Sequence, residues 1–207
     1  MVMTAEEKSA WLSARAGKLT ASRMADAMSY TAKGFPTAAR TKLLHELLAE
    51  RLTGESVPHV VTEPMLWGLE HEDEAVDCFV ERFPQFDVRR SRFYEHPEIE
   101  NFGATPDREI GADGLIEVKC PTTTKFVDWV MRGDVPDEHR PQMCAQLLCS
   151  GKAWVGFVAY DPRIRDESKR LFMRKFVPDP GELDLVKAEA IKFLTELDMM
   201  FDRFVTA

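Results

Sequence analysis

Alternating apolar and polar positions predict a β-hairpin within residues 104–120. Two short apolar runs, one ending near Ile110 and one covering Leu115 to Val118, are separated by Gly-Ala-Asp-Gly, which is typical of a turn between strands. Because side chains alternate along a strand, Glu117 and Lys119 are expected on one face and the valine between them on the other. A carboxylate and an ammonium group therefore share one surface of the predicted hairpin.

Elsewhere the spacing of apolar residues predicts a chain of mixed helices and strands. The leucines of residues 37–52 recur in an i, i+1, i+4, i+5 stripe, which is typical of a helix with one buried face. Residues 153–160 are nearly all apolar, as expected of a buried central strand. Further helices are predicted at residues 6–15, from Thr20 or Ser22 to about Met28, at 65–83, after a capping Thr122, at 136–151 and at 180–205, and further strands at 86–94, at 101–105 where the hairpin begins, and at 170–177.

Length and composition indicate one soluble globular domain. The 207 residues are enough for one core and too few for two substantial ones, and we find no repeat, low-complexity tract or linker, so residues 1–207 are interpreted as a single domain. No apolar run approaches the roughly 20 residues that cross a bilayer, and the N-terminus lacks a signal-peptide profile. We therefore expect a cytoplasmic protein that does not engage a membrane.

Cysteine spacing and net charge exclude some classes of protein. The four cysteines form no CxxC pair and no zinc-binding spacing, so they are interpreted as reduced, small core residues. A net charge of −8 argues against a protein that coats nucleic acid non-specifically. It does not exclude a nuclease, because a basic channel can coexist with acids gathered at a metal site.

Asp107 adds a second carboxylate to the predicted hairpin. If it ends its strand beside Glu117, two carboxylates converge on the hard-oxygen environment that Mg²⁺ prefers. A lysine beside such a site can orient or deprotonate a metal-bound water, or offset charge on a phosphate. The alternative is an ordinary exposed hairpin whose wet face carries a Glu and a Lys.

The spacing of these residues resembles a nuclease signature. Pro-Asp107 is followed ten positions later by Glu117-Val-Lys119, as in the PD-(D/E)xK nucleases, and flanking motifs from about Ala14 to Asp161 resemble the phage lambda exonuclease and YqaJ-type viral recombinase family. The resemblance implies an α/β fold with a restriction-endonuclease-like core, in which helices flank a mixed sheet of about five strands. It also implies 5′-to-3′ digestion of one strand of linear double-stranded DNA, which leaves a 3′ single strand for phage recombination by annealing.

The same resemblance implies roles for residues at the start of the chain. The segment from Arg15 through Thr20 and Ser22 resembles the part of the family that holds a 5′-terminal phosphate. From the residues alone, hydroxyls and cations at the start of a helix are suited to an anion, although a simple joint between two helices is the alternative. Arg40 is a further candidate for facing the DNA, with a solvated surface charge as its alternative.

Two helical segments carry the remaining candidates. Trp67-Gly68 followed by Glu72 resembles the family motif whose glutamate reaches the metal, with Glu70 as second candidate. Met65, just before this motif, matches an apolar residue that pries apart terminal base pairs, and core packing is the alternative. Gln142 resembles the family glutamine that orients the attacking water or the phosphate, with Gln146 less certain.

The resemblance thus implies a complete hydrolytic site. Asp107, Glu117, the Val118 carbonyl and Glu72 hold one or two Mg²⁺, for which Mn²⁺ is expected to substitute, while Lys119 serves the nucleophile. Family members form trimers, so a homotrimeric ring and a phage single-strand annealing protein as partner are expected. Two rivals remain: another nuclease of this class, either an endonuclease or a 3′-end enzyme, and a non-catalytic protein that binds DNA ends or a partner.

Overall fold

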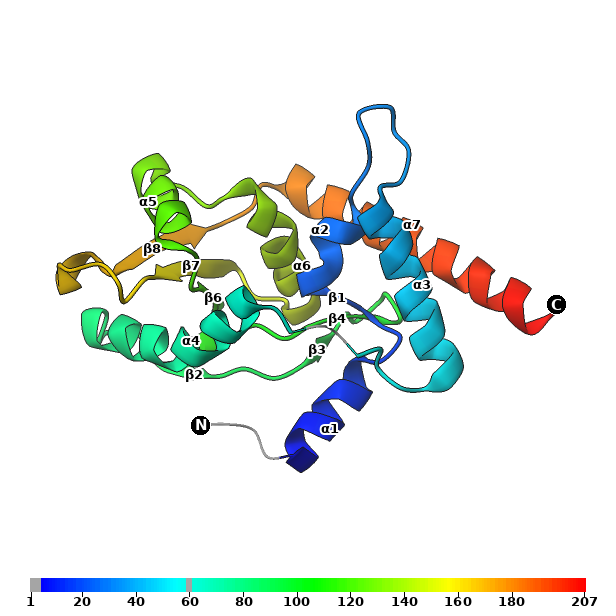
Figure 1. Cartoon of the computed structure of the whole chain (residues 1–207), viewed down its shortest axis with the longest axis horizontal. Helices are drawn as coiled ribbons and strands as arrows, with labels where there is room; N and C mark the ends of the chain where they lie inside the picture. The colour runs from blue at the N-terminus through cyan, green and yellow to red at the C-terminus, as the bar shows by residue number, and fades with distance from the viewer. Residues whose placement is uncertain (1–4, 59–60) are drawn as a thin grey trace.

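A mixed five-stranded sheet lies at the centre of the computed structural model, which describes residues 5–58 and 61–207 (Figure 1). Its strand order is β2-β5-β6-β7-β8, in which β6 and β7 are parallel and the other neighbours antiparallel. The predicted mixed sheet is confirmed. The strands are β2 (Val88–Arg90), β5 (Arg108–Ile110), β6 (Gly114–Lys119), β7 (Trp154–Tyr160) and β8 (Leu171–Phe176).

The predicted hairpin forms from β5 and β6. Ile110 pairs with Gly114 and Arg108 with Ile116, so the turn falls on the Gly-Ala-Asp segment. Gly111 adopts a positive φ of 58° there, which favours glycine because other residues are strained in that region. A side chain at Gly114 would collide with Ile110 and Trp154, since an added Cβ would lie 2.4 and 2.5 Å from their atoms.

A second, three-stranded sheet corrects two strand predictions. It has the order β1-β4-β3, with β1 (Leu19–Thr20) parallel to β4 (Phe102–Ala104) and β3 (Tyr94–Glu95) antiparallel to it. The strand predicted at 86–94 is therefore divided between two sheets, and residues 101–105 do not begin the hairpin. Alternation shows which residues are extended, but it does not show which strands pair.

Seven helices surround the sheets in the part of the chain that the structure describes. Thr37 caps the helix of the leucine stripe through its side chain, and Asp179 with Glu182 forms a capping box on the last helix. None of these helices is long and apolar enough to span a bilayer. The helices are α1 (Ala5–Arg15), α2 (Met24–Ala27), α3 (Ala38–Thr53), α4 (Glu63–Arg82), α5 (Thr123–Arg132), α6 (Arg140–Ser150) and α7 (Pro180–Val205), with 3₁₀ turns η1 (Ala21–Arg23), η2 (Asp137–His139) and η3 (Glu167–Lys169).

The structure changes the predicted capping of two helices. The helix expected from Thr20 or Ser22 to Met28 is instead the turn η1 followed by the four-residue α2. Thr20 belongs to β1, and its side chain caps neither. Thr122 precedes α5 as predicted, but its side chain makes no capping hydrogen bond.

The two faces of the five-stranded sheet are covered by different helices. On one face, Val76 and Phe79 of α4 pack with Ile116 and Val118. On the other, α6 packs against the alternate residues of the same strands, which include Leu115, and Trp129 of α5 contacts Phe157 of β7. Glu117 and Lys119 therefore project toward α6, whereas α4 covers the opposite face.

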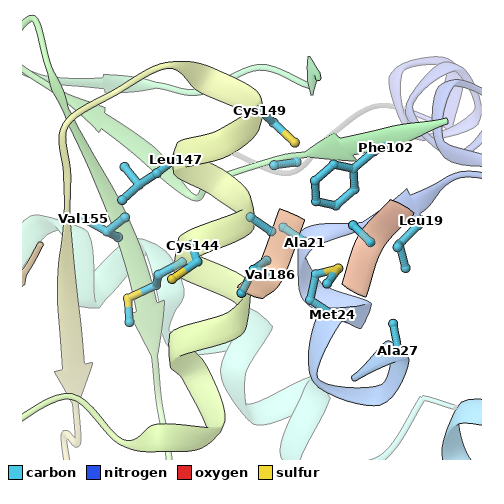
Figure 2. Packing of buried hydrophobic residues seen from close by; sticks show 14 of the residues in the cluster. Leu19, Ala21, Met24, Ala27, Phe102, Cys144, Leu147, Cys149, Val155 and Val186 are labelled. Atoms are coloured by element: carbon cyan, nitrogen blue, oxygen red, sulfur yellow. The ribbon is translucent and has the colours of Figure 1, made fainter. Parts of the chain in front are cut away.

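Helix α6 joins this sheet to the N-terminal segment. Figure 2 shows α6 between Val155 of β7 on one side and Leu19, Ala21 and Met24 on the other. All four cysteines are free thiols; Cys144 and Cys149 lie in the core, whereas Cys78 and Cys120 are only partly buried. Burial raises the pKa of the Cys144 thiol to about 12. This packing brings the segment that contains Thr20 and Ser22 close to the helix that faces Glu117.

Candidate active site

Asp107 lies at the end of the hairpin, beside Glu117. Its backbone N–H donates to the Ile116 carbonyl at 3.2 Å, and its Oδ2 accepts the Val118 N–H at 2.7 Å. Removal from water, followed by repulsion from Glu117 and Glu72, raises the pKa of Asp107 well above its usual range. The structure thus brings three predicted carboxylates into one electrostatic cluster.

Glu117 is held by three side chains although it is almost inaccessible to water. It is 1% exposed, its Oε1 accepts hydrogen bonds from Lys119 Nζ and from Gln142 Nε2, and its Oε2 accepts one from Gln146 Nε2. Gln142, the candidate for orienting the attacking water or the phosphate, contacts Glu117 and here orients its carboxylate. Gln146 does the same from one helical turn away, which the i, i+4 spacing of the two glutamines had indicated.

Lys119 completes this group as a cation. Burial alone would lower the pKa of its ammonium, but the carboxylates of Glu117 and Asp107 outweigh burial and raise the pKa above its usual range. Lys119 is therefore charged at neutral pH in this arrangement. It offsets negative charge at the point where the two acids meet.

Glu72 reaches the cluster from α4, and an arginine that sequence reasoning missed holds it. Arg108 Nη1 lies 3.1 Å from Glu72 Oε1, and Arg108 Nη2 lies 2.8 Å from Asp73 Oδ1. The second candidate, Glu70, is exposed. His71 stacks on Trp67 with ring centroids 3.8 Å apart, and its Nδ1 lies 2.9 Å from the Trp67 carbonyl, so the neighbouring histidine packs along the helix.

The chemistry of this group suits a hard divalent cation. Asp107, Glu117 and Glu72 offer only oxygen, the ligand that Mg²⁺ prefers. The Val118 N–H points to Asp107, and since the N–H and C=O of a strand residue face the same edge, its carbonyl also faces that side. Burial, followed by repulsion from Glu117 and Glu72, raises the pKa of Asp107, and a bound dication would offset the repulsion among these carboxylates.

The acids are nevertheless occupied by protein donors. Within residues 5–58 and 61–207, no three His, Cys, Asp or Glu side chains form a ready-made metal cage. Lys119 and the two glutamines occupy the Glu117 oxygens, and Arg108 occupies Glu72. A metal would therefore have to exchange with some of these donors.

Arg15 forms a second polar group with Thr105, a residue that the sequence analysis did not identify. Arg15 Nη1 donates to Thr105 Oγ1 at 2.8 Å, and its guanidinium lies 4.2 Å from the Trp11 ring centroid. Burial and then the nearby Arg23 lower the pKa of Arg15 to about 10, although Glu50 opposes this shift. Arg23 is itself paired with Glu46, so Arg15, with Thr105 beside it, is the cation of this group that is suited to an anion.

Strand pairing brings the other predicted phosphate ligands to the same region. Thr20 pairs with Gly103, two residues before Thr105, and the hydroxyls of Thr20 and Ser22 lie 3.3 Å apart. Thr105 is in turn two residues before Asp107. One short segment thus connects the group around Arg15 with the carboxylate cluster.

Gly17 is required by the turn that follows Arg15. It has a positive φ of 69°, its N–H donates to Glu50 Oε2 at 2.8 Å, and its carbonyl accepts from Arg51 Nε at 3.0 Å. An added Cβ would lie 2.7 Å from Arg51 Cγ. Glycine at position 17 thus allows Glu50 and Arg51 of α3 to form hydrogen bonds with this turn.

The structure contradicts the prediction for Arg40. Its side chain is 1% exposed, its Nε donates to the Ala27 carbonyl at 3.0 Å, and its Nη1 pairs with Glu196 at 2.7 Å. Arg40 is buried between α2 and α7 and cannot face DNA. The position of Arg40 in α3 left both a DNA-facing and a solvated side chain open, and the packing of α7 against α3 buries it instead. By contrast, Met65 is 54% exposed and remains available for its predicted role.

His139 provides a test of this region that does not depend on activity. Its ring stacks on Phe157 at 5.5 Å, and burial followed by the charges of Lys119 and Lys125 lowers its pKa from about 6.5 to about 4. On acidification, His139 is therefore protonated at a higher pH in the unfolded chain than in the folded protein. The free energy of unfolding falls as pH drops from about 6.5 to about 4. The expected loss is about 3 kcal/mol.

Chemical denaturation of wild type and His139→Gln between pH 4 and 8 measures this loss. The variant should lose less stability than wild type on acidification. His45→Gln, which changes an exposed histidine, serves as control and should follow wild type. Parallel curves for wild type and His139→Gln would show that His139 does not titrate in this way.

Comparison with known proteins covers most of the chain. The family model described as YqaJ-like viral recombinase domain matches residues 10–153. None of the curated proteins matches the chain. Among solved structures, an alkaline exonuclease (LHK-Exo) from Laribacter hongkongensis has 32% sequence identity and a TM-score of 0.86, over 95% of this chain and 96% of that one.

Two further structures are similar. One is LHK-Exo in complex with dAMP, with 33% identity and a TM-score of 0.86 over 94% of this chain and 95% of that one. A phage related exonuclease from Haemophilus somnus 129PT has 13% identity and a TM-score of 0.63 over 91% of this chain and 95% of that one. The last likeness concerns the fold alone.

Proposed function

The chain belongs to the YqaJ-like viral recombinase domain family, and on this premise we propose that it is a metal-dependent exonuclease that digests one strand of linear double-stranded DNA in the 5′-to-3′ direction. The observation that carries the proposal is the convergence of Asp107, Glu117 and Lys119 at the end of the hairpin. The similar LHK-Exo, solved in complex with dAMP, supports DNA as the substrate class.

The acids of this site would hold the metal. Asp107, Glu117, the Val118 carbonyl and Glu72 would be the ligands of one or two Mg²⁺, with Mn²⁺ as a substitute. When bound, the metal polarises the phosphodiester and lowers the pKa of the attacking water. The role of Gln142 and Gln146 is to keep the Glu117 carboxylate oriented, since both already donate to it.

Lys119 serves the attacking water and the phosphate. Its ammonium lies against Glu117 and keeps its charge, because the carboxylates raise its pKa. It therefore orients the water and offsets negative charge that develops on the phosphate. This role matters more as charge accumulates during the reaction than in the bound substrate, so it acts on the rate more than on DNA binding.

The group around Arg15 supports the direction of digestion. Arg15, Thr105, Thr20 and Ser22 would bind the terminal 5′ phosphate through one charged donor and three hydroxyls. Thr105 and Asp107 are two residues apart, a separation of at most roughly 7 Å along the backbone. A phosphate held there would lie about one nucleotide from the bond that is cut, as removal of nucleotides from a 5′ end requires.

The assembly and biological setting are proposed from the family alone. We expect a homotrimeric ring around the duplex, an assembly that suits digestion of many nucleotides without release. A phage single-strand annealing protein would receive the 3′ strand for recombination. The setting would be the cytoplasm of a bacterial host that carries the phage or prophage.

Arg15→Ala tests the direction most directly. The wild type is expected to digest a 5′-phosphorylated duplex about ten to a hundredfold faster than a 5′-hydroxyl duplex, because a charge-assisted contact is worth about 1.5–3 kcal/mol. The variant should lose most of this preference. Initial rates on both duplexes, with and without Mg²⁺ and at two salt concentrations, measure the effect.

The controls separate an end-binding arginine from a general cation. Arg132→Ala removes an arginine that is 69% exposed on α5 and should leave the end preference unchanged. If Arg15→Ala slows both duplexes equally and only reduces the salt dependence, Arg15 is a general DNA contact and the 5′ direction loses its support. Cutting of a closed circular duplex by wild type would instead identify an endonuclease.

A further inference from the structure

Arg108 joins the hairpin to two consecutive acids of α4. Its Nη1 donates to Glu72 Oε1 at 3.1 Å and to the Asp107 carbonyl at 2.7 Å, and its Nη2 donates to Asp73 Oδ1 at 2.8 Å. The guanidinium is largely shielded, with 17% of the side chain exposed. One arginine therefore binds the backbone of one proposed metal ligand and the carboxylate of another.

The two faces of the sheet explain why Glu72 pairs with Arg108. Arg108 is paired with Ile116, so it lies on the face that α4 covers, whereas Glu117 lies on the α6 face. Glu72 belongs to α4 and must reach past the end of β5 to approach Asp107. In this structure, Glu72 pairs with the Arg108 guanidinium on the α4 side.

We propose that Arg108 is a positioning residue that competes with the active-site metal for Glu72. Arg108 neutralises Glu72 when no metal is bound and releases it when a metal binds. Asp73 makes the release possible, because the guanidinium keeps Asp73 and the Asp107 carbonyl as partners after Glu72 has moved. This inference rests on the proposed metal-dependent function and adds a determinant of its metal affinity.

The proposal requires changes at Arg108 and at Asp73 to have opposite effects on metal affinity. Arg108→Gln removes the competing charge, so the acids should attract a dication more strongly, while the metal-free fold loses its ion pairs. Asp73→Asn removes the alternative anchor, so Arg108 should hold Glu72 more firmly and the metal should bind more weakly. A purely structural role for Arg108 would not produce opposite signs.

Binding of Mn²⁺ alone to the DNA-free protein tests the proposal. Electron paramagnetic resonance of free Mn²⁺ gives the affinity, and thermal melts with and without Mn²⁺ give a second readout. Arg108→Gln should bind Mn²⁺ about tenfold more tightly than wild type, which corresponds to the loss of one charge-assisted contact. Arg108→Gln should also melt at a lower temperature than wild type without metal, and its melting temperature should rise more when Mn²⁺ is added. Asp73→Asn should bind several-fold more weakly.

Two further variants keep the test decisive. Arg108→Lys retains the charge but cannot fork between two acids, so its Mn²⁺ affinity should lie between those of wild type and Arg108→Gln. It replaces Arg108→Gln in the test if the glutamine variant does not fold. Arg170→Gln removes an arginine paired with Glu167 at 3.0 Å and should not change Mn²⁺ affinity. Unchanged or weaker binding by Arg108→Gln, or unchanged or tighter binding by Asp73→Asn, would overturn the proposal. Failure of wild type to bind Mn²⁺ would instead overturn the metal site, and this inference with it.

Discussion

Lys119→Ala is expected to reduce hydrolysis by about a hundredfold to a thousandfold while leaving DNA binding intact. The expected size is that of losing a preorganised donor at a site where charge develops. Lys119 lies against Glu117, and the carboxylates keep it charged by raising its pKa. Its removal therefore deprives the water and the phosphate of the cation beside the two acids.

Single-turnover digestion and equilibrium DNA binding in Ca²⁺ separate the two parts of this prediction. Lys152→Ala is a matched control, because Lys152 is also a largely shielded lysine near a glutamate, 3.9 Å from Glu109. A melt of each variant checks that the protein is folded. Near-normal turnover by a folded Lys119→Ala protein would remove this residue from the mechanism.

Asp107→Asn and Glu117→Ala are both expected to abolish cleavage, yet to change stability in opposite directions. The pKa of Asp107 is raised in the folded protein, so the stability that this carboxyl contributes is present at low pH and is lost as pH rises through that pKa. Above that pH, an amide that still accepts the Val118 N–H should stabilise the metal-free protein. Asp107→Asn should therefore melt at a higher temperature at neutral pH.

Glu117→Ala should have the reverse effect on stability. The substitution leaves the buried donors of Lys119, Gln142 and Gln146 without their shared acceptor. Breaking a buried charged network in this way costs about 3–5 kcal/mol. Clustered acids do not behave alike, because Asp107 is repelled by its neighbours whereas Glu117 is surrounded by donors.

Denaturation in EDTA between pH 5 and 9 distinguishes the two acids. The advantage of Asp107→Asn over wild type should grow as pH rises, whereas Glu117→Ala should be less stable at every pH. Glu117→Gln, which retains one acceptor oxygen, should lose less than Glu117→Ala. Equal destabilisation by Asp107→Asn and Glu117→Ala would show that both acids are structural.

Local patterns were sufficient for the hairpin and for most long helices. The turn between Ile110 and Leu115 and the shared face of Glu117 and Lys119 follow from alternation, which involves only neighbouring residues. The leucine stripe of α3 and the apolar run of β7 depend equally on local spacing. Similarly, the four-residue spacing of Gln142 and Gln146 placed both glutamines on one face before their common partner was known.

The sequence by itself thus determined which residues share a face, and its motifs indicated Asp107, Glu117 and Lys119 as the chemical group. Only the tertiary structure decided which faces meet. The burial of Arg40 against Glu196, the contact of Arg15 with Thr105 and the hold of Arg108 on Glu72 join residues from 36 to 156 positions apart. Such contacts depend on how strands pair and helices pack, and periodicity within one element contains no information about its distant partner.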